Sequence, residues 1–228
     1  MHEVERGLNL VAALGMYTSE RDLVLSVPTT AMQEITELLF YQDIVEHHPL
    51  VVVHPGCSMP ARTYPWELYV QVIDELIEQL GAYVIVTGAE DERELVGRIL
   101  ESVQGEHRSM TLRLAGRLPF AEFCALIKTA DLTITNNTGP MHISAAVKTP
   151  VVALFALTNP PEQWGPWHVA HRQLYHEVSC RLCYSRICPY QHECLSLVTS
   201  QMVVDAAQEL LAAQPSGRER SLPVEARS

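Results

Sequence analysis

The sequence predicts an α/β fold in which helices cover both faces of a parallel β-sheet. Short apolar runs alternate along the chain with amphipathic segments, a pattern typical of a sheet buried between two helical layers. Glycine, asparagine, histidine and arginine gather where the apolar runs end. Because parallel sheets bind ligands at the carboxyl ends of their strands, this distribution predicts a binding site along one edge of the sheet.

The predicted strands are short apolar runs, each followed by a glycine or a polar turn. A run that is apolar at consecutive positions is typical of a strand buried on both faces of a sheet. The strands that this pattern predicts cover residues 50–53, 83–87, 111–114, 132–135 and 151–155, and residues 172–176 can form a sixth.

The segments between these strands have helical spacing and recognisable ends. Thr30 can cap a helix over residues 31–47, and Pro65 opens a helix that ends before Gly81. The polar tail, residues 215–228, is predicted to be disordered. Other helices are predicted over residues 4–14, 90–103, 119–129, 141–147 and 200–213.

Charge and composition argue against several classes of partner. The chain has 16 Lys and Arg against 27 Asp and Glu, so its formal net charge is 16 − 27 = −11. An acidic chain repels a phosphate backbone, which argues against nucleic acid as a partner. We see no basic segment followed by an apolar run at the N-terminus and no stretch of about 18 apolar residues, so the cytoplasm is the expected location.

The turn after the fourth predicted strand is the principal candidate for a binding site. It joins a buried strand to a helix, and the free backbone N–H groups at a helix start attract an anion such as phosphate. Gly139 lets the backbone approach a ligand closely, and Thr138 or Asn137 can cap the helix. The alternative is a capped helix start without a ligand. The candidate residues are Asn137, Thr138, Gly139, Pro140, Met141 and His142.

Two other strand ends carry polar candidates. Gly56 and the N–H groups after it can face a phosphate, and Arg62 stands just before a helix, where a cation can pair with a diphosphate. Glu90 follows Gly88, in a position where an acid often accepts hydrogen bonds from ribose hydroxyls. Each residue also has an alternative interpretation without a ligand. His54 can be a core histidine, Arg62 a solvated surface arginine, and Glu90 an acid that stabilises a helix N-terminus.

Four cysteines lie close together near the C-terminal end of the chain. In a reducing compartment such a cluster indicates a structural metal, either zinc or iron, before it indicates disulfides. Free or disulfide-bonded cysteines are the alternative. The four residues are Cys180, Cys183, Cys188 and Cys194.

Taken together, the motifs resemble glycosyltransferase family 9, the family of ADP-heptose:lipopolysaccharide heptosyltransferases. The resemblance spans about residues 50–211, and it depends on the order and spacing of the segments, each of which is weak alone. A cysteine cluster before the last helix also occurs in many members. The matching segments are Val53-His54-Pro55-Gly56, Arg62-x-Tyr64-Pro65, Val86-Thr87-Gly88, Leu114-Ala115-Gly116, Asn136 to His142, and Thr149 to Phe155.

The resemblance implies that this chain is the C-terminal half of a GT-B fold, in which two Rossmann-like domains face each other across a cleft. Residues 1–26 then correspond to a remnant of the N-terminal acceptor domain. Residues 27–214, including the cysteine cluster 180–194, correspond to the nucleotide-sugar-binding Rossmann-like domain. The general base is expected in the missing N-terminal domain, so the resemblance assigns no catalytic residue to this chain.

The family's donor-binding residues carry over at a few positions. Arg62 matches a basic residue, usually Lys, that contacts the donor phosphates, and Glu90 matches the acid that holds the ribose. Thr138, Gly139, Met141 and His142 match the donor-binding turn. Asn137 departs from the pattern, because the family usually has Asp there. An amide is neutral and also donates hydrogen bonds, so the resemblance leaves the donor sugar open.

The implied function is the transfer of a sugar from ADP-heptose, or a related nucleotide-sugar, to a lipid-linked acceptor of the lipopolysaccharide-core type. The chemistry requires no cofactor. The acceptor would bind through the missing N-terminal domain, with at most peripheral contact with the inner face of the plasma membrane. The alternative is a non-catalytic module that binds a nucleotide-sugar but lacks the acceptor domain and the base.

Overall fold

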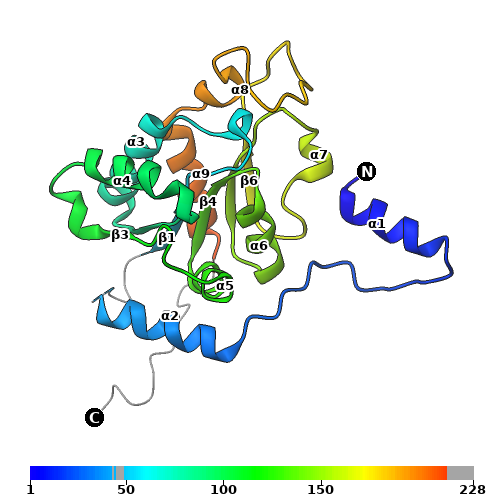
Figure 1. Ribbon diagram of the computed structural model, residues 1–228, viewed down its shortest axis with the longest axis horizontal. Coiled ribbons are helices and arrows are strands. Elements are labelled where there is room, and N and C mark those ends of the chain that lie inside the picture. The colour runs from blue at the N-terminus through cyan, green and yellow to red at the C-terminus, as the bar shows by residue number, and fades with distance from the viewer. Residues whose placement is uncertain (43, 45–48, 215–228) are drawn as a thin grey trace.

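The computed structural model, which describes residues 1–42, 44 and 49–214, confirms the predicted α/β fold (Figure 1). Six strands form one parallel sheet in the order β3-β2-β1-β4-β5-β6. Helices pack on both faces of this sheet. The strands are β1 (Leu50–His54), β2 (Tyr83–Val86), β3 (Thr111–Arg113), β4 (Leu132–Asn136), β5 (Val151–Leu154) and β6 (His171–Leu174).

The alternation of side chains along each strand explains why the apolar runs are continuous. On β1, Val51 and Val53 pack against one helical layer, whereas Leu50 and Val52 pack against the other. The first layer contains α3 (Trp66–Leu80), α4 (Arg93–Ser102) and α9 (Ser200–Ala212). The second contains α2 (Thr29–Tyr41), α5 (Phe120–Thr129) and, beside β5, α6 (Gly139–Val147).

The strand order creates one place where the connections diverge. From β1 the chain moves outward through β2 to β3, and it then returns to pair β4 with the other side of β1. Val53 is therefore opposite Val86 on one side and Ile134 on the other. The loops that follow β1 and β4 leave in opposite directions, and a crevice at this reversal is where open parallel sheets bind their ligands.

Several predicted helix boundaries differ from those in the structure. The helix expected over residues 31–47 is α2, which begins one residue before Thr30, so Thr30 cannot cap it; residues 43 and 45–48 lie outside the described part. The helix expected over residues 90–103 begins as a separate 3₁₀ turn, η2 (Glu90–Glu92). The sequence patterns also missed four short helices, namely η1 (Pro60–Arg62), η3 (His107–Met110), α7 (Pro161–Trp164) and α8 (Glu193–Ser196).

Helix α1 (Glu3–Ala12) lies beside the sheet domain, and an extended segment joins it to α2 (Figure 1). None of its described side chains is buried. Its start is held to the loop after α7, because the His2 ring stacks on Trp167 at 4.3 Å and bonds the carbonyl of Gly165. The predicted tail, residues 215–228, lies outside the described residues. No helix among the residues described is long and apolar enough to cross a bilayer.

Tyr64 joins the start of α3 to the segment before α9, and its removal tests this connection. Its buried hydroxyl donates to the carbonyl of Val198 at 2.7 Å. We expect Tyr64→Phe to lower the free energy of unfolding by about 1–2 kcal/mol, because a buried carbonyl loses its partner. Urea denaturation measures the change. Tyr17→Phe, at a residue that is 83% exposed, is the matched control and should change little; equal effects of the two variants would contradict the assignment.

Candidate functional site

The candidate site lies at the carboxyl ends of β1, β2 and β4, where the strand order reverses. Three loops meet there: the loop after β1, the turn that leads into η2, and the turn between β4 and α6. These loops carry all of the sequence-predicted candidates except the four cysteines. The predicted clustering of these loops at one edge of the sheet is therefore confirmed.

Asn136 connects the loops on the two sides of the reversal. Its side chain is fully buried at the end of β4. The amide group donates to the carbonyl of Pro55 at 2.8 Å and, at 3.4 Å, to that of Gly56. Its oxygen accepts from the backbone N–H of Tyr64 at 3.0 Å. One neutral side chain thus satisfies both ends of the β1 loop and fixes the distance between β1 and the turn after β4.

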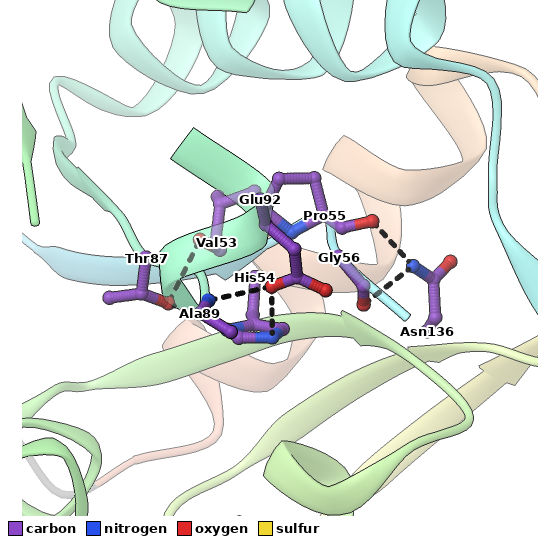
Figure 2. A network of polar contacts seen from close by, with 8 residues as sticks. All are labelled: Val53, His54, Pro55, Gly56, Thr87, Ala89, Glu92 and Asn136. Atoms are coloured by element: carbon purple, nitrogen blue, oxygen red, sulfur yellow. Dashed lines mark hydrogen bonds and ion pairs between the residues drawn. The ribbon is translucent and has the colours of Figure 1, made fainter. Parts of the chain in front are cut away.

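Glu92 occupies the space between the first two loops (Figure 2). Its carboxylate accepts from the backbone N–H of Ala89 at 2.7 Å and lies directly over Gly56. A methyl group added at Gly56 would overlap this carboxyl group. Gly56 is therefore required for close approach, and the group that approaches it is the protein's own acid.

His54 supports Glu92 from below. Its Nδ1 lies 3.0 Å from the hydroxyl of Thr87, and its Nε2 lies 3.6 Å from the Glu92 carboxylate. Burial lowers the pKa of His54 to about 4, so the ring is neutral near pH 7. Burial also raises the pKa of Glu92, whereas the Ala89 N–H bond opposes this shift. His54 is thus a core histidine satisfied by its neighbours, which was the alternative interpretation of this residue.

The acid predicted to hold a ribose, Glu90, points elsewhere. Its side chain is 71% exposed and pairs with Arg93 at 2.8 Å, over Gly116. Glu92, two residues later, has a side chain that is only 17% exposed and lies over Gly56 of the β1 loop. The sequence pattern selected Glu90 from its place after Gly88, but the direction of each of the three consecutive acids depends on the 3₁₀ turn of η2.

The turn after β4 has the predicted form, with one difference. Thr138 is the N-cap residue of α6, but no side-chain capping bond to α6 is found within the described residues. Asn137 is buried and its side chain bonds Ala156 and Asn159 in the loop after β5, so it cannot cap the helix either. Gly139 is exposed, and a methyl group added to it would meet open space. The predicted side-chain cap is therefore wrong. The space beside Gly139 at the start of α6 is open, although Pro140 has no N–H and the N–H of Met141 donates to the carbonyl of Thr138.

The other predicted residues lie around this helix start. Pro140 and Met141 are buried in the first turn of α6 and support it from the protein side. Burial lowers the pKa of His142, and the charges of His2 and Arg62 lower it further. Arg62 belongs to η1, on the opposite side of the reversal, but its Nε bonds Thr158 at 2.9 Å. Thr158 in turn bonds Asn159, which bonds Asn137, just before α6, so Arg62 lies near the start of α6. Positive potential from two elements converges on one crevice.

The four predicted metal ligands are free thiols in the segment between β6 and α9. The pKa of Cys194 is raised by burial and, to a lesser degree, by the neighbouring thiols of Cys188, Cys180 and Cys183. The Sγ of Cys188 accepts from the backbone N–H of Tyr190 and of His192. Among the described residues, no three His, Cys, Asp or Glu side chains are arranged to hold one ion, so we assign no chemistry to a metal.

The sequence patterns missed three polar residues of the site. The sequence patterns placed Asn136 in the turn after the fourth strand without a role of its own, whereas the structure places it in β4. Glu92 is one of three consecutive acids at a helix start, and the pattern did not single it out. Thr158, in the loop after β5, is buried and bonded to Arg62. A polar residue in an otherwise apolar strand end was the available signal for Asn136. For Thr158 we find no comparable signal.

Comparisons with known proteins agree with this fold. The family model for glycosyltransferase family 9 (heptosyltransferase) matches residues 1–193. Lipopolysaccharide heptosyltransferase 3 of Escherichia coli strain K12 is 29% identical over 224 residues, covering 96% of this chain and 62% of that protein. A solved family 9 glycosyl transferase of Veillonella parvula has a TM-score of 0.83 at 21% identity, covering 93% of this chain and 60% of that one.

A second solved structure supports the same fold. ADP-heptose lps heptosyltransferase II of E. coli has a TM-score of 0.69 at 23% identity, and the match covers 83% of this chain and 53% of that one. This chain therefore spans about three-fifths of the length of the curated relative and of the Veillonella protein that it matches.

The buried neutral His54 makes a specific prediction about acid stability. Its pKa falls from 6.5 to about 4 on folding, so the unfolded chain binds more protons between these values. Its contribution is complete above pH 6.5 and is lost as the pH falls toward 4, by up to about 3 kcal/mol. Glu92, whose pKa is raised, acts in the opposite direction: its contribution to the free energy of unfolding decreases as the pH rises above its ordinary pKa.

A variant that lacks His54 separates its contribution to the pH dependence from that of Glu92. We expect His54→Gln to lose less free energy of unfolding than the wild type between pH 6.5 and pH 4.5, as measured by urea denaturation. His176→Gln, at an exposed histidine, is the control and should follow the wild type. Parallel pH profiles for the wild type and His54→Gln would show that His54 does not remain neutral in the folded protein.

Proposed function

Because this chain belongs to glycosyltransferase family 9, the heptosyltransferase family, we propose that it binds the diphosphate of a nucleotide-sugar in the crevice between β1 and β4. The observation that carries the proposal is the chain of hydrogen bonds through Thr158 and Asn159 that brings Arg62 close to the turn before α6. A guanidinium donates up to five hydrogen bonds, and a helix start offers backbone N–H groups and the positive end of the helix dipole. The two together complement a diphosphate.

We assign the ribose of the nucleotide to Glu92, in place of Glu90. Glu92 lies beyond the carboxyl end of β2 with its carboxylate over Gly56 of the β1 loop, and Ala89 and His54 hold it there. A carboxylate in this topological position can accept hydrogen bonds from two vicinal hydroxyls. Glu90 is directed outward and neutralised by Arg93, which leaves it without access to the same ligand.

The donor in this proposal is ADP-heptose or a related nucleotide-sugar, because a solved relative of this fold is an ADP-heptose lps heptosyltransferase. The role of this domain in transfer is electrostatic: Arg62 and the start of α6 stabilise the charge that develops on the departing diphosphate. A general base outside this chain would activate the acceptor hydroxyl. The acceptor would be a lipid-linked oligosaccharide of the lipopolysaccharide-core type, with at most peripheral contact with the membrane.

We further propose that residues 1–26 belong with an N-terminal acceptor domain, and that residues 27–214 form the donor domain. The exposed apolar side chains of the first segment support this division. Leu10, Leu14 and Tyr17 are 73%, 75% and 83% exposed. Apolar side chains of this size, gathered on one short segment, are typical of a surface that another domain covers.

A non-catalytic nucleotide-sugar-binding module is the second candidate function. Asn137 favours it, because this position usually carries an acid in the family and here the amide bonds other protein groups. Binding of the donor without sugar transfer, in a protein that also carries the acceptor domain, would support this alternative. Transfer of heptose to the acceptor by the same protein would exclude it.

A structural zinc or iron at Cys180, Cys183, Cys188 and Cys194 stays a prediction. The close spacing of the four cysteines in the sequence supports it, and the thiolate is the form of cysteine that binds such ions. Metal analysis of protein purified without chelators tests it. About one equivalent of zinc or iron per chain, lost in Cys188→Ser, is the expected result, and a metal-free folded protein would contradict it.

Titration calorimetry with ADP tests the proposed donor site. We expect the wild-type chain to bind ADP and Glu92→Gln to bind it about fivefold to twentyfold more weakly, because a charged acceptor of ribose hydroxyls is lost. Glu90→Gln, two residues away, is the matched control and should bind within about twofold of the wild type. A folded wild-type protein that does not bind millimolar ADP would refute the proposed function.

A further inference from the structure

A second polar network lies on the other side of the crevice from Glu92, and it leads directly to Arg62. Thr158, in the loop after β5, is buried and accepts from the Nε of Arg62 at 2.9 Å. The two residues are 96 positions apart in the chain and belong to loops on opposite sides of the strand reversal. Neither terminal nitrogen of Arg62 has a hydrogen-bond partner among the residues that the structure describes.

The Thr158 hydroxyl also bonds the amide side chain of Asn159, which Asn137 holds in turn. It donates to Oδ1 of Asn159 at 3.4 Å, and the same oxygen accepts from Nδ2 of Asn137 at 3.2 Å. Oδ1 of Asn137 accepts from the backbone N–H of Ala156 at 3.1 Å. Asn137 therefore uses both functions of its amide, and an aspartate could not donate to Asn159. The residue that departs from the family pattern is matched to its neighbour in this chain.

The backbone on both sides of the contact is held by the segment that carries the cysteines. Tyr184 donates its N–H to the carbonyl of Thr158 at 3.1 Å, and the N–H of Ala61, beside Arg62, bonds the carbonyl of Arg186 at 3.0 Å. The His192 ring bonds the carbonyl of Pro60 at 3.1 Å. The segment over residues 183–192 thus joins η1 to the loop after β5 and sets the distance that the Arg62 side chain spans.

We propose that Thr158 is a positioning residue for Arg62: its hydroxyl holds Nε, so that the terminal nitrogens are presented to the diphosphate. A long arginine side chain loses rotamer entropy when it is fixed. Because the bond at Nε fixes Arg62 before the ligand arrives, ligand binding loses less conformational entropy. Asn159 and Asn137 orient the hydroxyl as an acceptor toward Arg62. This inference rests on the proposed function, since it assigns Arg62 the same ligand.

A double-mutant cycle measured by calorimetry with ADP tests the role of Thr158 in the full chain. We expect Thr158→Val to weaken ADP binding about threefold to tenfold, and Thr158→Ser, which keeps the hydroxyl, to bind within about twofold of the wild type. In an Arg62→Ala background, Thr158→Val should have no further effect. Additive losses, or an equal loss in Thr158→Ser, would overturn the positioning role.

A readout without ligand separates this proposal from the proposed function. The Nε–H of Arg62, identified by its absence in Arg62→Ala, should give a protected NMR signal in the wild type and in Thr158→Ser. In Thr158→Val it should move to the position of solvated arginines. An unprotected wild-type signal would overturn the contact itself. A protected signal in a protein that does not bind ADP would refute the proposed diphosphate ligand, and it would therefore also refute the positioning role of Thr158.

Discussion

The buried amide of Asn136 is the interaction on which the candidate site depends. A strand reversal leaves a crevice whose two walls belong to separate loops, and such loops move apart unless something joins them. Asn136 bonds the carbonyls of Pro55 and Gly56 from one wall while it belongs to the other. A charged residue would not serve as well, because it would have to be desolvated and could not both donate and accept.

With the walls fixed, each half of the crevice has its own chemistry. On the β2 side, Glu92 presents a carboxylate whose partners are a backbone N–H and a neutral histidine. On the β5 side, Arg62 and the start of α6 present donors and positive potential. A nucleoside diphosphate has hydroxyl donors at one end and an anion at the other. The charge distribution across the crevice therefore matches the polarity of such a ligand.

The sequence predicted the sheet well, because apolar runs report burial directly. The parallel strands and the gathering of polar residues at their ends were all predictable from period and composition. Glu92 and Thr158 were not, because which side chain enters a crevice depends on the local turn and on partners distant in sequence. Thr158 meets Arg62 across 96 positions, and Glu92 is distinguished from Glu90 only by a 3₁₀ turn. The capping roles expected of Thr30 and Thr138 failed for a related reason, since caps depend on φ and ψ as much as on residue type.

The β1–β4 pairing at the middle of the sheet has a consequence for how this domain is synthesised. Val51 is opposite Leu132, a separation of 132 − 51 = 81 residues, and the segment that braces Arg62 comes only after residue 182. Such contacts give the fold a high contact order, for which slow folding is expected. While the ribosome is still adding the last helix, the strands emerge with unpaired edges and apolar faces, and the proposed diphosphate site is incomplete. Nascent chains of this protein would thus be candidates for chaperone protection until the C-terminal third has emerged.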